Sequence, residues 1–405
     1  MLESRFFYTT YQNWTLTQDM KKWLIYITLA CITFPYYIEF TVITLILIAG
    51  KKGKEIFKNL SSKEFCIFGI FIVIESIIVL NLNYDIKKFS EQILLLFLFY
   101  ITYKTFSKYL FKDITLFSKY YLNFTTFLSI YSIIGLALGH NQGGRAIGFV
   151  GEAGDLAAIL LPSIIYYIYN KKINYKSIIT IIDFLLALSA ASILALIIIL
   201  FIIYIYPLLF NNKKNITRKW IYIAGLITVA LLGFKQLNKE SDSQFLKRFQ
   251  DTIQGLDITE LDYKDLEVFN ASTYAWLTNI KVAIEAPYRI SGTGLGTHKD
   301  SYERLNPETF NSYRLYGLNK DDAYSIATRI YSELGLIGLI VLICFIYKNM
   351  NRQNVGNMMA LGYLLNRLIT GGHYTTTGMF LFLFLYYYTN KKNTIKNDFH
   401  NNSNI

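Results

Sequence analysis

Long apolar runs with few charged residues recur along this chain and constrain its fold more than any other feature. Examples are LIYITLACITF, IFGIFIVIESIIVL and IIILFIIYIYPLLF, with short polar breaks between runs. Runs of this length and composition are typical of membrane-spanning helices rather than of a soluble core. Length alone would suggest two or three soluble domains for 405 residues. The hydropathy instead predicts an all-α polytopic membrane protein with one large polar loop inserted in it.

We predict about twelve transmembrane helices. They lie near residues 22–34, 36–50, 65–82, 90–106, 115–138, 155–170, 175–188, 191–210, 219–234, 324–347, 354–371 and 374–389. The first two form one apolar run broken at Pro35 and Glu39, which fits either a tight hairpin or one long kinked helix. The predicted organisation is an N-terminal bundle of about nine spans (1–235), a large external loop containing helices (236–323), C-terminal spans (324–390) and a cytoplasmic polar tail (391–405).

Clusters of basic residues set the predicted orientation. They fall on one side of the twelve spans, at Lys51, Lys52, Lys54, Lys58 and Lys63, at Lys104, Lys108 and Lys112, at Lys171 and Lys172, at Lys213, Lys214, Arg218 and Lys219, and at Lys391, Lys392 and Lys396. The positive-inside rule makes that side cytoplasmic, with Lys87–Lys88 as the exception. This pattern accounts for the net charge of +12, so we expect no nucleic-acid partner. Loop 236–323 and the short loop that carries Arg145 then face outside.

The short outer loop reads HNQGGRAIGFVGEAGDLAAILLP over residues 140–162. Its glycines disfavour a regular helix and let backbone N–H groups approach a ligand. Arg145 stands alone among them, and Asp155 can cap the span that follows. The alternative is a plain turn whose arginine extends to water.

The large outer loop is the most acidic part of the chain, with 14 of the 28 acidic residues against 10 basic ones. Trp276, Ile280, Ala283 and Ile284 form an apolar stripe with helical spacing, which indicates a helix lying over a cavity or on the membrane surface. The segment PYRISGTGLGTH, residues 287–298, follows this helix. Its alternating glycines favour close approach to a phosphate or sugar, but no βαβ setting supports a dinucleotide site.

Several charged residues surround the last spans. Asp321 and Asp322 precede a span, where acids favour a helix N-terminus. Arg329 and Glu333 are four residues apart on one helix face and can pair, for structural or for catalytic reasons. Arg367 lies inside an apolar span, so we expect it to face a partner or a wet cavity. The three cysteines lie in apolar runs without metal or disulfide spacing.

Three of these segments, taken in order, resemble the O-antigen polymerase and O-antigen ligase superfamily of bacterial membrane proteins. The first is Arg145-Ala-Ile-Gly148 through Glu152 to Asp155; the second is the Trp276 helix leading to Pro287 and Gly292, Gly294 and Gly296; the third is Glu333-Leu-Gly335-Leu-Ile-Gly338. The similarity covers about residues 145 to 338. Ligases of this family place a His-Asn pair after the large loop, where this chain has Asp321-Asp322-Ala-Tyr324. That difference favours a polymerase.

The resemblance implies a glycosyltransferase that polymerises oligosaccharide repeat units carried on undecaprenyl diphosphate into O-antigen or capsule, at the outer face of the bacterial cytoplasmic (inner) membrane. Arginines would stabilise the departing diphosphate, and a carboxylate or histidine would orient or deprotonate the acceptor hydroxyl. The expected catalytic residues are Arg145, Arg289, Glu152, His298 and Asp322, with Asp321 as a further candidate base. The expected substrate-binding residues are Arg248, Arg314, Gly148, Gly292, Gly294 and Gly296. We expect no metal ion and no cofactor, and membrane lipid and a chain-length regulator protein as further partners.

Other functions remain open on the sequence. The first alternative is an O-antigen ligase, which would transfer finished glycan from undecaprenyl diphosphate to a lipid A core. A transporter or flippase of lipid-linked sugar is the alternative outside the enzyme class, and it predicts ionisable residues in mid-membrane; Arg367 and Glu75 fit that expectation. A sensor or scaffold would not require the arginine and glycine segments.

Overall fold

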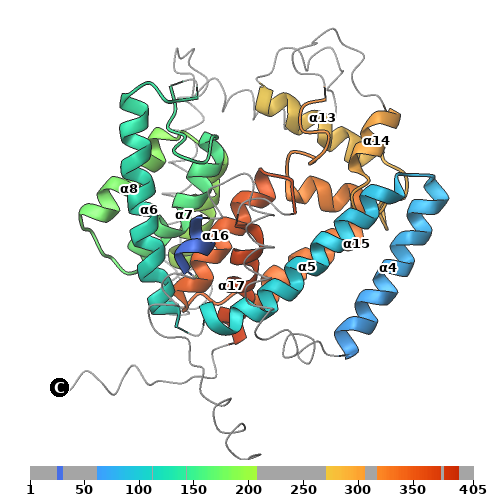
Figure 1. Cartoon of the computed structure of the whole chain (residues 1–405), viewed down its shortest axis with the longest axis horizontal. Helices are drawn as coiled ribbons and strands as arrows, with labels where there is room; N and C mark the ends of the chain where they lie inside the picture. The colour runs from blue at the N-terminus through green and yellow to red at the C-terminus, as the bar shows by residue number, and fades with distance from the viewer. Residues whose placement is uncertain are drawn as a thin grey trace, which may run out of the picture.

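The computed structural model describes residues 25–30, 62–111, 113–142, 144–207, 271–305, 317–374 and 378–391, and this part of the chain is all-α (Figure 1). Its helices are α4 (Ser62–Leu82), α5 (Ile86–Leu110), α6 (Ile114–Ala137), α7 (Ala153–Tyr169), α8 (Tyr175–Leu186), α9 (Ala190–Leu200), the π-helix η1 (Phe201–Ile205), α13 (Ala271–Glu285), α14 (His298–Leu305), α15 (Ile326–Asn349), α16 (Val355–Ile369) and α17 (Met379–Lys391). A further helical stretch covers residues 25–30.

Nine of the twelve predicted spans coincide with helices of the structure, namely α4 to α8, α9 with η1, and α15 to α17. The predicted span 219–234 lies outside the described residues, as does 36–50, and 22–34 is described only in part. By length and composition, one described helix, Ile326–Asn349, can cross a membrane, and Cys66–Leu82, Ala153–Tyr169 and Ala190–Ile205 are shorter apolar helices. The all-α class is therefore confirmed, and twelve spans stay a prediction.

Short polar side chains start several of these helices. Asp113 accepts a hydrogen bond from the backbone N–H of Leu116 at the start of α6, and Asn174 forms a reciprocal capping box with Ser177 at the start of α8. Such caps satisfy N–H groups that the first helical turn leaves unpaired. The predicted cap at Asp155 is wrong. Glu152 is the N-cap residue of α7, and Asp155 lies in the first turn, where an ion pair holds its carboxylate.

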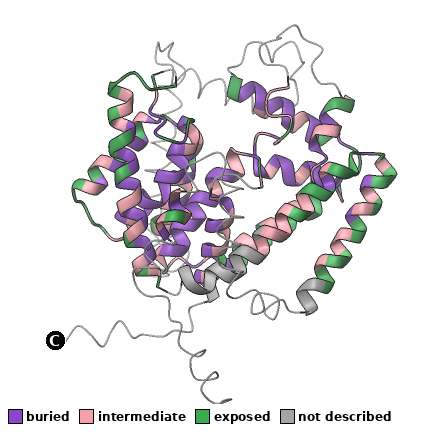
Figure 2. Ribbon diagram, in the orientation of Figure 1, coloured by how far each residue is buried: buried purple, intermediate pink, exposed green. Residues whose placement is uncertain are grey.

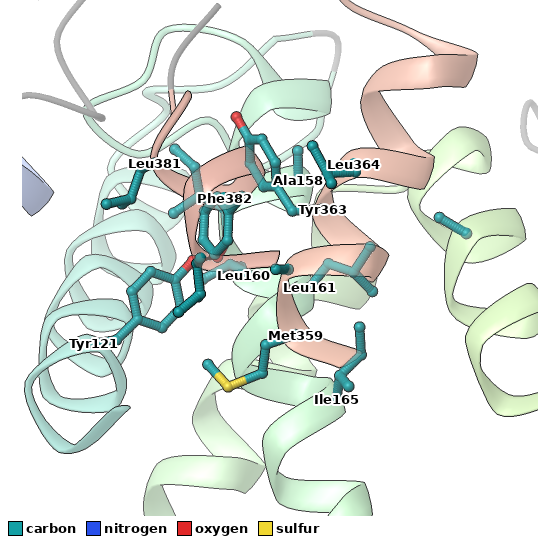
Figure 3. Packing of buried hydrophobic residues seen from close by; sticks show 14 of the residues in the cluster. Tyr121, Ala158, Leu160, Leu161, Ile165, Met359, Tyr363, Leu364, Leu381 and Phe382 are labelled. Carbon is teal, nitrogen blue, oxygen red and sulfur yellow. Dashed lines mark hydrogen bonds between the residues drawn. The ribbon is translucent and has the colours of Figure 1, made fainter. Parts of the chain in front are cut away.

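The core lies where α7 and α16 cross (Figure 3). Gly362 of α16 sits so close to α7 that a Cβ there would overlap Ile165. The ring of Tyr363 stacks on Phe382 of α17 with centroids 4.3 Å apart, and Tyr121 of α6 meets Phe382 edge-on at 5.7 Å. Close backbone approach and aromatic packing therefore join these four helices in the core.

The helices around this core are exposed on their outer faces (Figure 2). α4 and α5 form a slanted pair, and α14 lies beside the turn that joins α4 to α5 (Figure 1). Contacts fix that placement: the backbone N–H of Asp85 donates to Asp300 at 3.0 Å, and Tyr84 shares a hydrogen bond with Ser301. Lys88 also lies 3.9 Å from Asp300. Lys88, one of the two lysines that depart from the positive-inside pattern, therefore lies next to an acidic residue of the predicted large loop.

Helix α15 is broken at Gly335, which has φ 64° and ψ −162°. The loop before α14 fills the break. The N–H groups of Leu336 and Ile337 donate to the carbonyls of Arg289 and Ile290, at 2.9 Å and 3.1 Å. Partners from another segment therefore satisfy the backbone groups that the break leaves unpaired.

We expect Gly335→Ala to destabilise the protein strongly. Its backbone conformation is nearly restricted to glycine and costs other residues about 1–3 kcal/mol, and a Cβ would also overlap the carbonyl of Ile290. Gly69→Ala in α4 is the matched control, since nothing lies within 4 Å of its Cβ position. Thermal unfolding of the two purified variants measures the difference. Equal melting temperatures would contradict this account of the break.

Candidate functional site

Several chain segments that are far apart in sequence meet at one end of the helices. The end of α16 reaches the start of α7 through Arg367 and Asp155, and the start of α15 reaches the segment after α16 through Arg329 and Gly372. The loop that carries Arg145 joins this end, because the N–H of Ala146 donates to the carbonyl of Leu186 at 3.2 Å. Two of the three segments singled out in the sequence are thereby brought to one region.

The Arg145 loop is a tight turn held by its own side chains. Arg145 and Gln142 pair through their backbones, and the Arg145 guanidinium donates to the backbone and side-chain oxygens of Gln142 at 3.4 Å each. The Gln142 side chain also accepts from the N–H of Ala153 at 3.3 Å, which ties the loop to the start of α7. Gly148 has φ +56° and is packed against Leu128 of α6. Arg145 is thus half-buried, and its guanidinium is oriented by hydrogen bonds to the uncharged Gln142.

Arg367 forms a buried ion pair at the same end. Its guanidinium is 1% exposed, and Nη1 lies 2.5 Å from Oδ1 of Asp155. Nε donates to the hydroxyl of Tyr363 at 3.0 Å. The expectation that Arg367 faces a partner is therefore confirmed. The pair connects α16 to the first turn of α7, where the helix dipole also favours a carboxylate.

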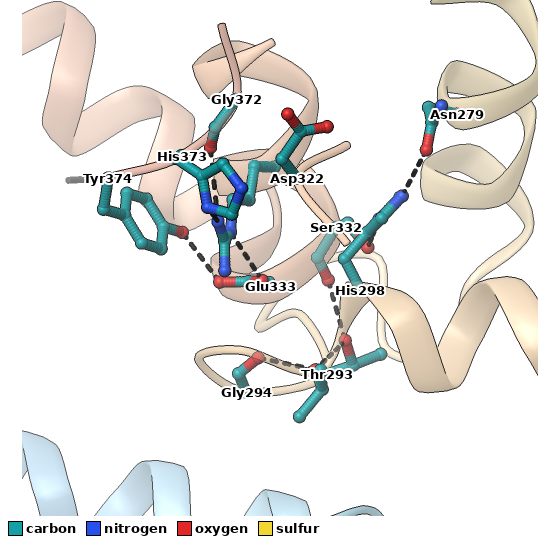
Figure 4. Close-up of polar contacts among 12 residues, drawn as sticks. Asn279, Thr293, Gly294, His298, Asp322, Ser332, Glu333, Gly372, His373 and Tyr374 are labelled. Atoms are coloured by element: carbon teal, nitrogen blue, oxygen red, sulfur yellow. Dashed lines mark hydrogen bonds and ion pairs between the residues drawn. The ribbon is translucent and has the colours of Figure 1, made fainter. Parts of the chain in front are cut away.

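Arg329 and Glu333 form a second buried pair, which confirms that they lie on one helix face (Figure 4). Nε of Arg329 lies 2.9 Å from Oε1 of Glu333, and the two residues are 3% and 0% exposed. The other carboxylate oxygen accepts from the hydroxyl of Tyr374 at 2.8 Å. Arg329 also contacts the carbonyl of Gly372 and Nδ1 of His373, at 3.4 Å and 3.5 Å. This pairing fixes the segment after α16 against α15.

Glu152 and Asp322 are close enough to these charges to interact with them. Although Glu152 is exposed as a residue, partial desolvation of its carboxyl raises its pKa, and Asp155 and Asp322 add to the rise. Arg367 and Arg145 act in the opposite direction. Glu152 makes no side-chain hydrogen bond to the start of its helix. A carboxyl group with a raised pKa that faces arginines is suited to proton transfer.

Asp322 is more constrained. One carboxylate oxygen accepts from the backbone N–H of Tyr324 at 3.1 Å, and the other accepts from the amide of Asn319 at 3.2 Å. A Cβ on Gly372 would overlap the carbonyl of Asp322, so the two segments are in direct contact. The neighbouring Asp321 pairs with Lys299 at 2.8 Å. Burial alone would raise the pKa of Asp321, but Lys299 lowers it overall.

The glycine segment uses its amides internally. The N–H of Thr293 donates to the carbonyl of Ser332 at 3.1 Å, and that of Gly294 donates to the carbonyl of Glu333 at 2.8 Å. A Cβ at Gly292 or Gly294 would overlap Glu333 or Val79, and one at Gly296 would lie 2.8 Å from Gln92. Close packing against α4, α5 and α15 accounts for these glycines. Their predicted contact with substrate stays a prediction.

His298 is fully enclosed at the start of α14. Nε2 lies 2.8 Å from Oδ1 of Asn279, and Nδ1 lies 2.9 Å from the hydroxyl of Ser332 (Figure 4). The amide oxygen of Asn279 can only accept, so Nε2 carries the proton and Nδ1 accepts from Ser332. Burial, and next the charge of Arg329, lower the pKa of His298 to about 3. A neutral histidine with both nitrogens occupied joins α13, α14 and α15, and its role as a base stays a prediction.

The remaining predicted residues lie apart from this cluster or outside the described residues. The side chain of Arg289 is exposed on the loop that fills the α15 break. Arg248 and Arg314 lie outside the described residues. The structure adds Asn279, Ser332 and Tyr374 to the site. An uncharged side chain carries no distinct signal in a single sequence, so only their contacts reveal them.

The described part of the chain has no group of three or more His, Cys, Asp or Glu residues arranged to hold a metal ion. No protein-family model matches the chain, and a search of the curated proteins finds no match. The candidate site therefore has to be interpreted from its own residues and geometry.

We expect Asp155→Asn to destabilise the protein by about 3–5 kcal/mol, because it leaves the Arg367 guanidinium buried without its counter-charge. Glu285→Gln is the matched control. Glu285 pairs with Lys281 at 3.9 Å on an exposed face, where such a pair contributes about 0–1 kcal/mol. Chemical unfolding of both variants in the same detergent tests this difference. Similar losses in the two variants would mean that Asp155 does not neutralise Arg367.

Stability should also depend on pH through His298. Its pKa is 6.5 ordinarily and about 3 when folded, so the unfolded chain binds an extra proton between these values. The free energy of unfolding should therefore fall as pH drops below 6.5, by up to ~1.4 kcal/mol per pH unit. His298→Gln should flatten this slope, and the exposed His140→Gln should not. Melting temperatures across the acid range measure it, and equal slopes in both variants would refute the assignment.

Proposed function

We propose that this protein is a membrane glycosyltransferase of the O-antigen polymerase type. It joins repeat units carried on undecaprenyl diphosphate at the outer face of the bacterial cytoplasmic membrane. The observation that carries the proposal is the meeting of residues 145–155, 322–333 and 367–374 at one end of the helices. These segments bring Arg145, which donates to the amide oxygen of Gln142, near the Glu152 carboxyl, whose raised pKa suits proton transfer.

The surface of the outer helices supports a membrane location. α4 exposes a stripe of large apolar side chains, namely Ile67, Ile70, Val73, Ile74, Ile77 and Leu80. The second half of α15 does the same at Leu336, Ile337, Ile340, Val341 and Ile343. Exposed apolar surface of this extent is unfavourable in water and favourable against lipid. Twelve spans, with the large loop outside, remain part of the proposal.

Arginine charge would stabilise the diphosphate leaving group. Arg329 and Arg367 are each neutralised by a buried carboxylate, so we assign them to positioning. Arg145 donates to the neutral Gln142 and is half-buried at the site, and Arg289 is exposed beside the glycine segment. Guanidinium groups form two-point hydrogen bonds with phosphate oxygens, and their effect is largest where charge develops in the transition state. Arg145 is therefore the main candidate for the diphosphate, with Arg289 second.

Glu152 is the best-placed base among the candidates. His298 has both nitrogens occupied, Asp321 is paired with Lys299, and Asp322 accepts two local hydrogen bonds. In the proposed step the acceptor hydroxyl oxygen forms a bond to the anomeric carbon of the growing chain. The bond from that carbon to the diphosphate oxygen breaks, and its electron pair leaves with the diphosphate. The hydroxyl proton passes to Glu152, whose raised pKa suits a proton acceptor.

The test is surface glycan display in a deletion strain that is complemented with each variant at equal expression. Wild type should restore a full ladder of polysaccharide on gels, and Arg145→Ala and Glu152→Gln should leave a single-repeat band. Loss of one preorganised donor to the leaving group costs about 10²–10³ in rate. Lys172→Ala, an exposed change at the opposite end of α7, is the control and should give the full ladder.

The same gels separate the alternatives. Loss of every band above the core, with long chains accumulating on undecaprenyl diphosphate, would identify a ligase instead. An unaltered ladder in the deletion strain would exclude both transferases and favour a transporter or scaffold. A full ladder from Arg145→Ala, with a single-repeat band in the deletion strain, would remove Arg145 from the mechanism.

A further inference from the structure

Three polar side chains meet inside the interface between α6 and α8, apart from the ion pairs described above. Asp183 of α8 and Ser129 of α6 are 0% exposed, and Ser132 of α6 is 1% exposed. Both serines lie close enough to act on the Asp183 carboxyl. Within the described residues, however, neither carboxylate oxygen and neither hydroxyl makes a hydrogen bond of ordinary geometry. Four enclosed oxygens therefore lie in one region, with the two serine hydroxyls beside the carboxyl but outside ordinary hydrogen-bond geometry.

A carboxylate in such a place needs a counter-charge. Burying an unpaired charge is far more costly than burying a paired one. Two carboxylates of the described residues have arginine partners, whereas Glu75, which is also enclosed, has one oxygen without a hydrogen-bond partner. Glu333 pairs with Arg329, and Asp155 pairs with Arg367. Among the described lysines, arginines and histidines, none pairs with Asp183.

We propose that Asp183, Ser129 and Ser132 bind a small monovalent cation, sodium. All the donors are oxygens, which hard cations prefer. A single carboxylate balances one positive charge, whereas divalent ions are usually held by more than one carboxylate or by phosphate groups. Sodium ions bound inside membrane proteins use oxygens near helix ends in the same way, and Asp183 lies in the last turn of α8. This site is separate from the proposed diphosphate site and does not depend on it.

The bound cation would stabilise the position of the Arg145 loop, which packs against α6 and α8. A Cβ on Gly148 would lie 3.5 Å from the Cβ of Ser132, so the loop packs directly on the proposed site. The N–H of Ala146 donates to the carbonyl of Leu186, one turn after Asp183. Binding between α6 and α8 would therefore hold together the two helices on which the loop rests.

The experiment is thermal unfolding of the purified full-length chain in detergent at constant pH and ionic strength, with sodium exchanged for N-methylglucamine. We expect a saturable rise of about 2–4 °C in the wild-type melting temperature. Asp183→Asn should abolish the response to sodium, and Ser129→Ala with Ser132→Ala should shift it to higher concentration. Asp113→Asn removes an exposed carboxylate at the start of α6 and should keep the full response.

Binding of radioactive sodium to the wild type and to Asp113→Asn tests the site without relying on the folding of Asp183→Asn. Saturable binding in both proteins, competed by unlabelled sodium and lost with the double serine variant, supports the proposal. A wild-type melting temperature that is the same in both cations would overturn it. The proposal would also be overturned if the melting temperature did not respond to sodium but rose as the pH fell in the wild type and not in Asp183→Asn. A proton would then neutralise Asp183 in place of sodium.

Discussion

Two buried guanidinium groups constrain the described structure more than any other interaction. An arginine enclosed among apolar helices is far more stable beside a carboxylate. One pair joins two segments that are distant in sequence, and the other lies within α15 and holds a distant segment through further hydrogen bonds. Arg367 and Asp155 connect α16 to the start of α7, and Arg329 and Glu333 hold Gly372 and Tyr374 against α15. These two pairs fix the start of α7 and the segment after α16 at this end of the helices. The site is therefore assembled by charge neutralisation at the ends of helices that pack through apolar contacts.

Backbone hydrogen bonding imposes the second constraint. The break in α15 exposes amides and carbonyls in an apolar surrounding, and the loop before α14 satisfies them. Glycine is required on both sides, because Gly335 adopts a conformation other residues avoid and Gly292 contacts the helix backbone directly. The segment before α14 is thus attached to α15 by main-chain hydrogen bonds, which hold His298 and Ser332 in fixed register.

In the proposed mechanism, structural and reactive roles fall on different residues of the same cluster. Arg329, Glu333, Arg367, Asp155 and His298 all have their polar atoms engaged inside the protein. Glu152 makes no capping hydrogen bond, and the Arg145 guanidinium donates to the amide oxygen of Gln142. A transferase of lipid-linked sugars needs this separation, since the groups that meet the diphosphate and the acceptor must not be neutralised by the framework that positions them.

The sequence alone determined the all-α class and the positions of nine helices, because apolar runs and their polar breaks report local burial directly. It also indicated that Arg329 pairs with Glu333, since a spacing of four on one helix face requires no tertiary information. Only the tertiary structure decided that Arg367 pairs with Asp155, that Asp155 does not cap α7, and that the glycines at 292 and 294 pack on α15. Those outcomes depend on contacts between segments up to 212 residues apart, and no local pattern encodes which distant partner neutralises a buried charge or fills a helix break.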